Sequence, residues 1–213
     1  MTDENYVSMF SYVKNILRDN DNNATKLIEK FPFRIRSAHI WKVYNWAKRL
    51  ADINEYRNLN TEALLIASLF HDAGYAISPN SKEHAKNSEI IFREYSQENN
   101  FQKEKEDFIA YLVKNHSNKK LMDNEDTPIE LIMLFEADIL DETGTMSILW
   151  DCMAEGTKEK QSYITTYEHI KTNTMKILNG NPMKTQKGKQ YWEKKQKSVR
   201  NFIEELAYDL GIE

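Results

Sequence analysis

Apolar residues recur every three or four positions along most of this chain, the spacing that lets an amphipathic helix bury one face. No alternating strand pattern of useful length and no internal repeat interrupts this spacing. A run of Asp and Asn predicts a polar loop over residues 19–23. Capping residues and breakers divide the rest into predicted helices over residues 4–18, 24–30, 34–51, 62–75, 82–97, 103–116, 128–142, 145–155, 158–178 and 188–210. The sequence therefore predicts an all-α fold.

Several of these predicted helices carry explicit start or stop signals. Asn60 can cap the helix that begins near residue 62, and Gly74 can end it. Ser81 can cap the next helix, and the segment 127–130, Thr-Pro-Ile-Glu, has the form of a capping box with proline at the first helical position. Only six glycines and four prolines occur in the chain, which favours long helices joined by short connections.

Composition narrows the classes of partner and compartment. The 213 residues suit one domain, predicted over residues 1–213, and the segment after Gly156 could be an appended helical hairpin. The net charge of −4 without a basic stripe argues against a nucleic acid polymer as partner. A single cysteine, Cys152, excludes an internal disulfide framework and fits a reducing compartment. No apolar run is long enough to span a membrane, and the acidic N-terminus does not resemble a signal peptide. We therefore expect a cytoplasmic protein with no membrane partner.

The most apolar predicted helix ends in two polar side chains. Residues 63–70 are Ala, Leu, Ile, Ser or Phe, so this helix is apolar on all sides and should cross the core. His71 and Asp72 follow directly, and burying both costs several kcal/mol without compensation. A hydrogen-bonded His–Asp pair is one solution. A divalent cation is another, because neutral imidazole and carboxylate are both good metal ligands.

Other polar side chains lie on faces that should point inward. His39 shares its helical face with Val43, and His116 follows Leu112 and Val113 in the last turn of its helix. A lone inward histidine is usually a satisfied core residue, but three of them beside Asp72 indicate a metal site.

Asp138 emerges from the apolar face that contains Leu134 and Phe135, where an uncompensated carboxylate would be protonated or expelled. Capping of the next helix or a pair with Arg36 are the alternatives for this carboxylate. His84 begins a helix and could be solvated. His169 has Thr, Asn and Lys as helical neighbours, so we expect it on a wet face outside any site.

The order of these residues resembles a known family. His39, then His71-Asp72, then Asp138, each on its own helix, is similar to the HD-domain superfamily of metal-dependent phosphohydrolases. The resemblance extends over about residues 30–155 and implies a helical bundle, with residues 156–213 as a C-terminal helical extension. Where many relatives continue this motif with a lysine or an acidic residue, this chain has Tyr75.

The resemblance implies a function and a set of site residues. It implies hydrolysis of a phosphate ester or pyrophosphate bond in a small phosphorylated metabolite, with a nucleotide as the expected substrate class. One or two divalent ions (Mn, Fe, Co, Ni, Zn or Mg) would be the cofactor, and a homodimer is an open possibility. The expected metal ligands are His39, His71, Asp72, His84, His116 and Asp138, with His84 and His116 where two-metal members carry extra ligands, and with catalytic roles for Asp72, His84 and His116.

Nearby basic residues are candidates for binding substrate phosphate. Arg34, Arg36, Lys114 and Lys119 lie close in sequence to the expected ligands, although solvated helix ends explain any one of them equally well. The alternative to an enzyme is a non-catalytic, metal-supported module that binds a nucleotide or regulates a partner. The departure at Tyr75 keeps that alternative open.

Overall fold

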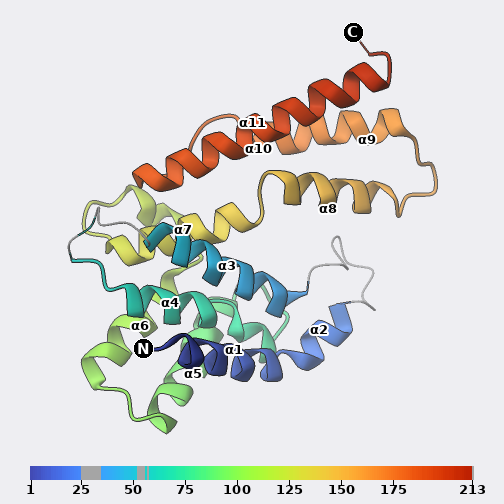
Figure 1. The fold of residues 1–213 in the computed structure, drawn as a ribbon. Helices are drawn as coiled ribbons and strands as arrows, with labels where there is room; N and C mark the ends of the chain where they lie inside the picture. The colour runs from blue at the N-terminus through green and yellow to red at the C-terminus, as the bar shows by residue number, and fades with distance from the viewer. Residues whose placement is uncertain (25–34, 52–55, 57, 213) are drawn as a thin grey trace. The chain divides into compact units, whose positions relative to one another are not determined.

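The structure, a computed structural model, describes residues 1–24, 35–51, 56 and 58–212. These residues form helices and turns and contain no strand, which confirms the predicted all-α fold (Figure 1). No helix within the described ranges is long and apolar enough to cross a membrane. The chain divides into two compact units, Met1–Asp138 and Ile139–Glu213. This division falls earlier than the predicted start of the extension near residue 156, and the single domain expected for residues 1–213 stays a prediction.

The N-terminal unit (Met1–Asp138) is built from helices whose order matches the predicted one. Its elements are α1 (Asp3–Ile16), α2 (Arg18–Ala24), α3 (Arg36–Ala51), α4 (Thr61–Phe70), the 3₁₀ helix η1 (Ala73–Ala76), α5 (His84–Glu98), α6 (Lys103–Asn115), the 3₁₀ helix η2 (Lys119–Asp123) and most of α7 (Ile129–Asp141). The predicted helix over 24–30, beyond its first residue, and Arg34 lie outside the described residues.

The polar segment after α1 is helical rather than a loop. The prediction of a polar loop over residues 19–23 is wrong, because these residues form most of α2. The Asp21 carboxylate accepts hydrogen bonds from the backbone N–H groups of Arg36, at 2.8 Å, and Ser37, at 3.3 Å. This carboxylate therefore satisfies free donors at the start of α3, a tertiary contact that the local composition does not reveal.

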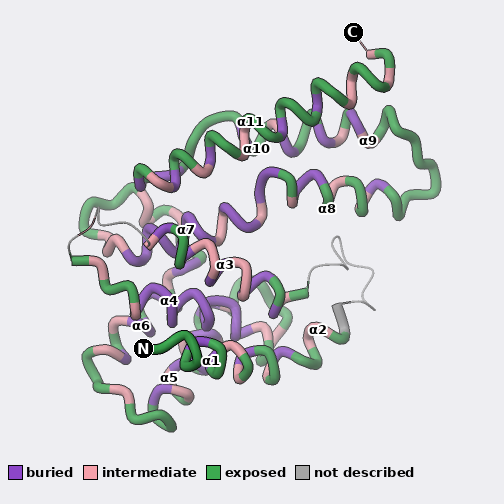
Figure 2. Tube along the Cα trace, in the orientation of Figure 1, coloured by how far each residue is buried: buried purple, intermediate pink, exposed green. Residues whose placement is uncertain are grey.

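Helix α4 is the centre of the N-terminal unit. Every residue from Ala63 to Phe70 is buried (Figure 2), as the apolar run predicted. The helix packs against α1, α3, α5 and α6. Its start follows the prediction, because the Asn60 side chain accepts a hydrogen bond from the Ala63 N–H at 3.0 Å. Four helices thus surround α4, and His71 and Asp72 follow directly after its last residue.

Gly74 does not end this helix as predicted. Helix α4 ends at Phe70, and the chain turns through His71 and Asp72 into η1. Gly74 instead allows η1 to lie against the start of α5. A Cβ atom at Gly74 would be 2.1 Å from the His84 carbonyl oxygen and 2.5 Å from the Ser88 nitrogen. The Gly74 N–H donates to the Ser88 hydroxyl at 2.8 Å, which holds the two elements together.

Helix α7 starts where the sequence predicted, but its polar side chains make other contacts. It begins at Ile129, one residue after the proline. The Thr127 hydroxyl donates to the Leu121 carbonyl oxygen at 2.7 Å, and the Glu130 carboxylate accepts from the Asn60 N–H at 2.6 Å. The Glu130 side chain therefore joins the starts of α7 and α4.

The C-terminal unit (Ile139–Glu213) contains the end of α7 followed by four helices and one irregular turn. These are α8 (Thr145–Glu155), α9 (Tyr163–His169), the π-helical turn η3 (Ile170–Thr174), α10 (Met175–Leu178) and α11 (Gln186–Asp209). The helix predicted over 158–178 begins later, at Tyr163, and contains the π turn. The core of the C-terminal unit is formed by large apolar side chains from α8 to α11, among them Ile148, Tyr167, Ile170, Leu178, Trp192 and Val199.

His169 is partly exposed, but it also contacts acidic side chains that the prediction of a solvated face did not include. Its imidazole is half-buried, with Nε2 at 3.3 Å from Asp151 Oδ1 and Nδ1 at 3.1 Å from Glu155 Oε1. The two carboxylates lie one turn apart on α8. The hydroxyl of Thr174, the last residue of the π turn, donates a hydrogen bond to Asp151 Oδ2 at a distance of 2.6 Å. The polar neighbours of His169 on its own helix concealed these acidic partners across the helix pair.

We predict that Gly74→Ala destabilises the protein by about 1–3 kcal/mol, the usual cost of inserting a methyl group into a packed contact. The new Cβ would collide with backbone atoms of α5, which cannot rotate away as a side chain can. Urea denaturation followed by circular dichroism measures the effect. Gly156→Ala is the matched control, because its Cβ would meet no atom closer than 3.2 Å. Equal stability of the two variants would contradict the close approach of η1 and α5.

We predict that His169→Ala lowers stability by about 1 kcal/mol, because two acidic side chains on α8 lose a partner. Metal content and any activity should stay within about twofold of the wild type, since no expected metal ligand touches this imidazole. Thermal melting and elemental analysis measure the two effects. A loss of bound metal would show that His169 takes part in the metal site.

Candidate metal centre

His71 and Asp72 are buried at the end of α4. The His71 Nδ1–H donates to the Ser68 carbonyl oxygen at 2.8 Å, one turn earlier in the helix. This bond leaves the lone pair of Nε2 directed away from the helix. Burial lowers the pKa of His71 to about 3, so the ring is neutral near pH 7. The local helix geometry therefore prepares a neutral imidazole nitrogen that can bind a metal ion.

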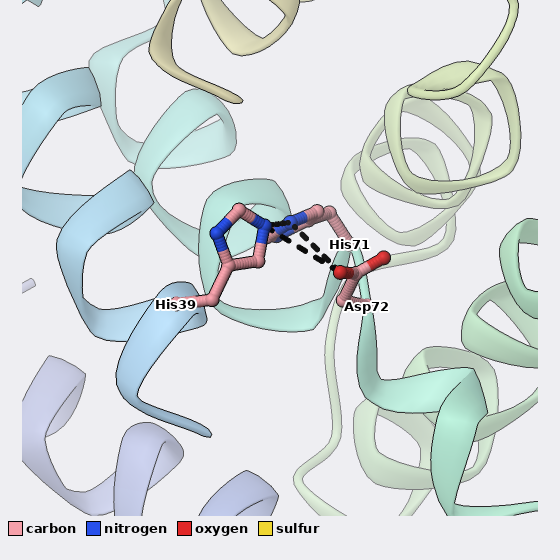
Figure 3. Close-up of side chains that lie close together, drawn as sticks. All are labelled: His39, His71 and Asp72. Carbon is pink, nitrogen blue, oxygen red and sulfur yellow. Dashed lines mark hydrogen bonds and ion pairs between the residues drawn. The ribbon is translucent and has the colours of Figure 1, made fainter. Parts of the chain in front are cut away.

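His39 approaches the same point from α3. Its Nε2 lies 3.3 Å from His71 Nε2 and 3.5 Å from Asp72 Oδ2. Figure 3 shows the three side chains lying close together. His39 Nε2 is also 3.3 Å from Oδ1 of Asp138 on α7. Three helices thus bring together the four residues that the sequence predicted as a first site.

His84 and His116 meet on the other side of Asp72. Their Nε2 atoms lie 3.0 Å apart, and each is 3.4 Å from Asp72 Oδ1. The Nδ1–H of His116 donates to the Val113 carbonyl oxygen at 2.7 Å, and that of His84 donates to the Ser81 carbonyl oxygen. Ser81 is not the predicted N-cap, since α5 begins at His84. His84 is half-buried within the cluster rather than solvated.

These six residues, His39, His71, Asp72, His84, His116 and Asp138, form a cluster that contains hydrogen-bond acceptors facing one another. With both Nδ1 protons donated to carbonyl oxygens, the Nε2 atoms of His84 and His116 each present a lone pair across 3.0 Å. A proton on His84 would supply one bond, but burial opposes the charged ring and lowers its pKa. Asp72 adds further acceptors and no donor. A bound cation would satisfy these lone pairs, and the donor set is compatible with a divalent metal ion.

The ligand atoms also have the separations that a metal ion needs. Two groups, His39 with His71 and Asp72, and Asp72 with His84 and His116, each have ligand atoms within 4.8 Å of one another. Asp72 belongs to both groups, with Oδ2 facing the first and Oδ1 facing the second. The carboxylate is therefore placed to bridge two ions.

Two basic side chains neutralise the carboxylates. Arg36 donates to Asp72 Oδ2 and Lys119 donates to Asp138 Oδ2, both at 2.6 Å. Burial alone would raise the pKa of both carboxyl groups. For Asp72 the charge of Arg36, together with smaller contributions from the neighbouring histidines, outweighs burial and holds the pKa well below its ordinary value. For Asp138 the charge of Lys119 and the neighbouring histidines together have the same effect on the pKa. Both carboxylates are therefore ionised and available as ligands near neutral pH.

Lys114 and Tyr75, which the sequence also singled out, differ in whether they lie near the cluster. Lys114 pairs with Glu89 at 3.1 Å and is more than half exposed, so the structure does not bring it to the cluster. Tyr75 does lie at the cluster, with the Arg36 guanidinium over one side of its ring and the His84 ring stacked against it. The sequence indicated only that Tyr75 departs from the family pattern, because no local spacing predicts a stack between three separate elements.

Comparisons with known proteins found a matching family model and several solved structures with a similar fold. The family model of the HD domain matches residues 36–143, about half of the chain. Similar solved structures include an HD-superfamily hydrolase from Bacillus thuringiensis, 19% identical, with a TM-score of 0.68 over 99% of this chain and 98% of that one. Bacillus subtilis YpgQ in complex with ADP is 18% identical, with a TM-score of 0.64 over 97% and 95% of the two chains.

A predicted HD superfamily hydrolase from an uncultured Thermotogales bacterium is 15% identical, with a TM-score of 0.63 over 96% of this chain and 92% of that one. At these identities the structural likeness shows a shared fold. The comparison with curated proteins found no match. The match of the family model shows that the chain belongs to the HD domain family.

Proposed function

We propose that this protein is a metal-dependent phosphohydrolase that acts on a small phosphorylated metabolite. The observation that carries the proposal is that the Nε2 atoms of His84 and His116 face each other and Asp72, while the Nδ1–H groups of both rings donate to backbone carbonyl oxygens. Membership of the HD family supports metal-dependent hydrolysis in general. A metal site retained only for stability would not require basic side chains poised beside both carboxylates.

Six residues would hold the metal. His39, His71, Asp72 and Asp138 would hold a first ion, and His84, His116 and the shared Asp72 a second. Imidazole and carboxylate ligands without a thiolate suit Mn, Fe, Co, Ni, Zn or Mg. Bound divalent ions lower the pKa of water, which makes hydroxide available near neutral pH, and they neutralise charge on phosphate oxygens. Fixing of the Nδ1–H groups by Ser68, Ser81 and Val113 keeps three of the imidazoles in the tautomer that binds a metal ion.

Arg36 and Lys119 would bind the substrate phosphate. Each now donates to a carboxylate that is also a proposed metal ligand. When a divalent ion takes over the charge of these carboxylates, the two basic side chains become able to bind phosphate oxygens, and a guanidinium can do so through two parallel hydrogen bonds. Lys114 is withdrawn as a phosphate ligand, since Glu89 already pairs with it.

A nucleotide is the proposed substrate class. The B. subtilis protein YpgQ, which shares this fold, has been solved in complex with ADP. At 18% sequence identity, this complex supports testing nucleotides first as substrates. A phosphate group at the basic side chains would account for affinity whatever the base, so related sugar phosphates belong in the same screen.

We predict that the protein purified without a chelator or a nickel column carries between about one and two equivalents of a divalent transition metal, and that chelation lowers its melting temperature. The ions would add links between α3, α4, α5 and α6 to the packing between these helices, so removing the ions should loosen the bundle. Elemental analysis and thermal melting test this. Less than about 0.2 equivalents, with none taken up on dialysis, would contradict a metal centre of this affinity.

We predict that phosphate or pyrophosphate is released from nucleotides or phosphate esters when Mn²⁺, Co²⁺, Ni²⁺ or Mg²⁺ is supplied. His84→Ala and His116→Ala should each lose about one metal equivalent, keep the fold and reduce turnover by orders of magnitude, since each removes one of three ligands. Lys114→Ala is the control and should change turnover by less than about twofold. If metal and nucleotide bind but no substrate is hydrolysed, the protein is the non-catalytic binding module instead.

A further inference from the structure

Tyr75 lies directly beside the proposed bridging carboxylate. It is the third residue of η1 and follows Asp72 by three positions, with its N–H donating to the Asp72 carbonyl oxygen at 3.3 Å. Residues three apart in a 3₁₀ helix lie one above the other. The turn therefore places the Tyr75 side chain on the same side of the backbone as the Asp72 carboxylate.

Two groups that contact Asp72 cover the Tyr75 ring. The Arg36 guanidinium carbon lies 3.9 Å from the ring centroid, and the His84 ring is stacked at a centroid distance of 5.0 Å and an interplanar angle of 23°. Arg36 donates to Asp72 Oδ2, while His84 Nε2 lies 3.4 Å from Oδ1. The ring thus contacts both groups that engage the two oxygens of one carboxylate.

The backbone fixes the position of this ring. The close approach at Gly74 and its hydrogen bond to Ser88 hold η1 against α5, the helix that begins with His84. The packed main chain therefore keeps the backbones of Tyr75 and His84 close to each other, which allows their rings to stack. Arg36, a long side chain from another helix, gains a fixed surface against which its guanidinium can lie.

We propose that Tyr75 is a positioning residue, which holds the His84 imidazole toward the second metal ion and the Arg36 guanidinium toward the substrate phosphate. The role belongs to the ring, through its contacts with both groups, and not to the hydroxyl. The part that concerns Arg36 rests on the proposed phosphohydrolase function. The part that concerns His84 rests only on the second metal site, so the two parts can fail separately.

Mn²⁺ titration of the metal-free protein by calorimetry tests the His84 part. Tyr75→Leu should weaken the second Mn²⁺ equivalent by about tenfold, the size of a desolvated contact with an aromatic ring, and leave the first unchanged. Tyr75→Phe should stay within about twofold of the wild type, and so should Tyr111→Leu, which removes an exposed tyrosine of α6. Circular dichroism checks folding, and Tyr75→Met repeats the test if the leucine variant does not fold.

Steady-state kinetics at saturating Mn²⁺ test the Arg36 part. Tyr75→Leu should raise KM by about tenfold and change kcat by less than about threefold, because the ring would act on ground-state phosphate binding. Once Arg36→Met is present, adding Tyr75→Leu should have no further effect on KM. This lack of additivity distinguishes positioning of Arg36 from a general loss of packing.

Three results would overturn the proposal. Unchanged Mn²⁺ affinity and unchanged KM in Tyr75→Leu would show that the stack has no consequence. Equal damage from Tyr75→Phe would assign the role to the hydroxyl, and a single Mn²⁺ site in the wild type would remove the His84 part. A wild type that binds two Mn²⁺ ions but hydrolyses nothing refutes the proposed function, while the titration still decides the role of the ring at His84.

Discussion

The structure depends on a buried carboxylate, Asp72, whose neighbours are the donor Arg36 and several imidazole nitrogens that present lone pairs. Imidazole nitrogens approach it from both sides, and the protons of three rings are directed outward to backbone carbonyl oxygens. Burial raises the cost of leaving such a group without positive charge. Four helices end at or pass this point, so the arrangement of the N-terminal unit and the chemistry of the cluster cannot be separated.

Two basic side chains supply the positive charge beside these carboxylates, and both could also bind a substrate phosphate. Arg36 and Lys119 neutralise Asp72 and Asp138 in the structure described here, and both carboxylates stay ionised because of them. A divalent ion satisfies the same carboxylates with greater charge density and more ligand positions. The basic side chains are then free to neutralise an anionic substrate. One set of contacts would therefore serve both the stability of the metal-free protein and the binding of phosphate.

The sequence predicted those parts of this arrangement that depend on one helix at a time. The apolar run before His71 showed that α4 crosses the core, and the inward faces of α3 and α6 identified His39 and His116. What it missed depends on contacts between elements. The helical α2, the partners of His169 and the stack on Tyr75 are each fixed by a side chain from another segment. Gly74 shows this difference, because its role in a close approach cannot be distinguished from a helix stop without knowing where α5 lies.

The most direct measurement is an anomalous difference map from crystals grown with Co²⁺ and without chelator. The account predicts one peak among His39, His71, Asp72 and Asp138, and a second among Asp72, His84 and His116. It also predicts that Arg36 and Lys119 lose their contacts with the two carboxylates when the ions are present. A map without a peak near Asp72, with both basic side chains still on their carboxylates, would contradict the metal centre and with it the proposed function.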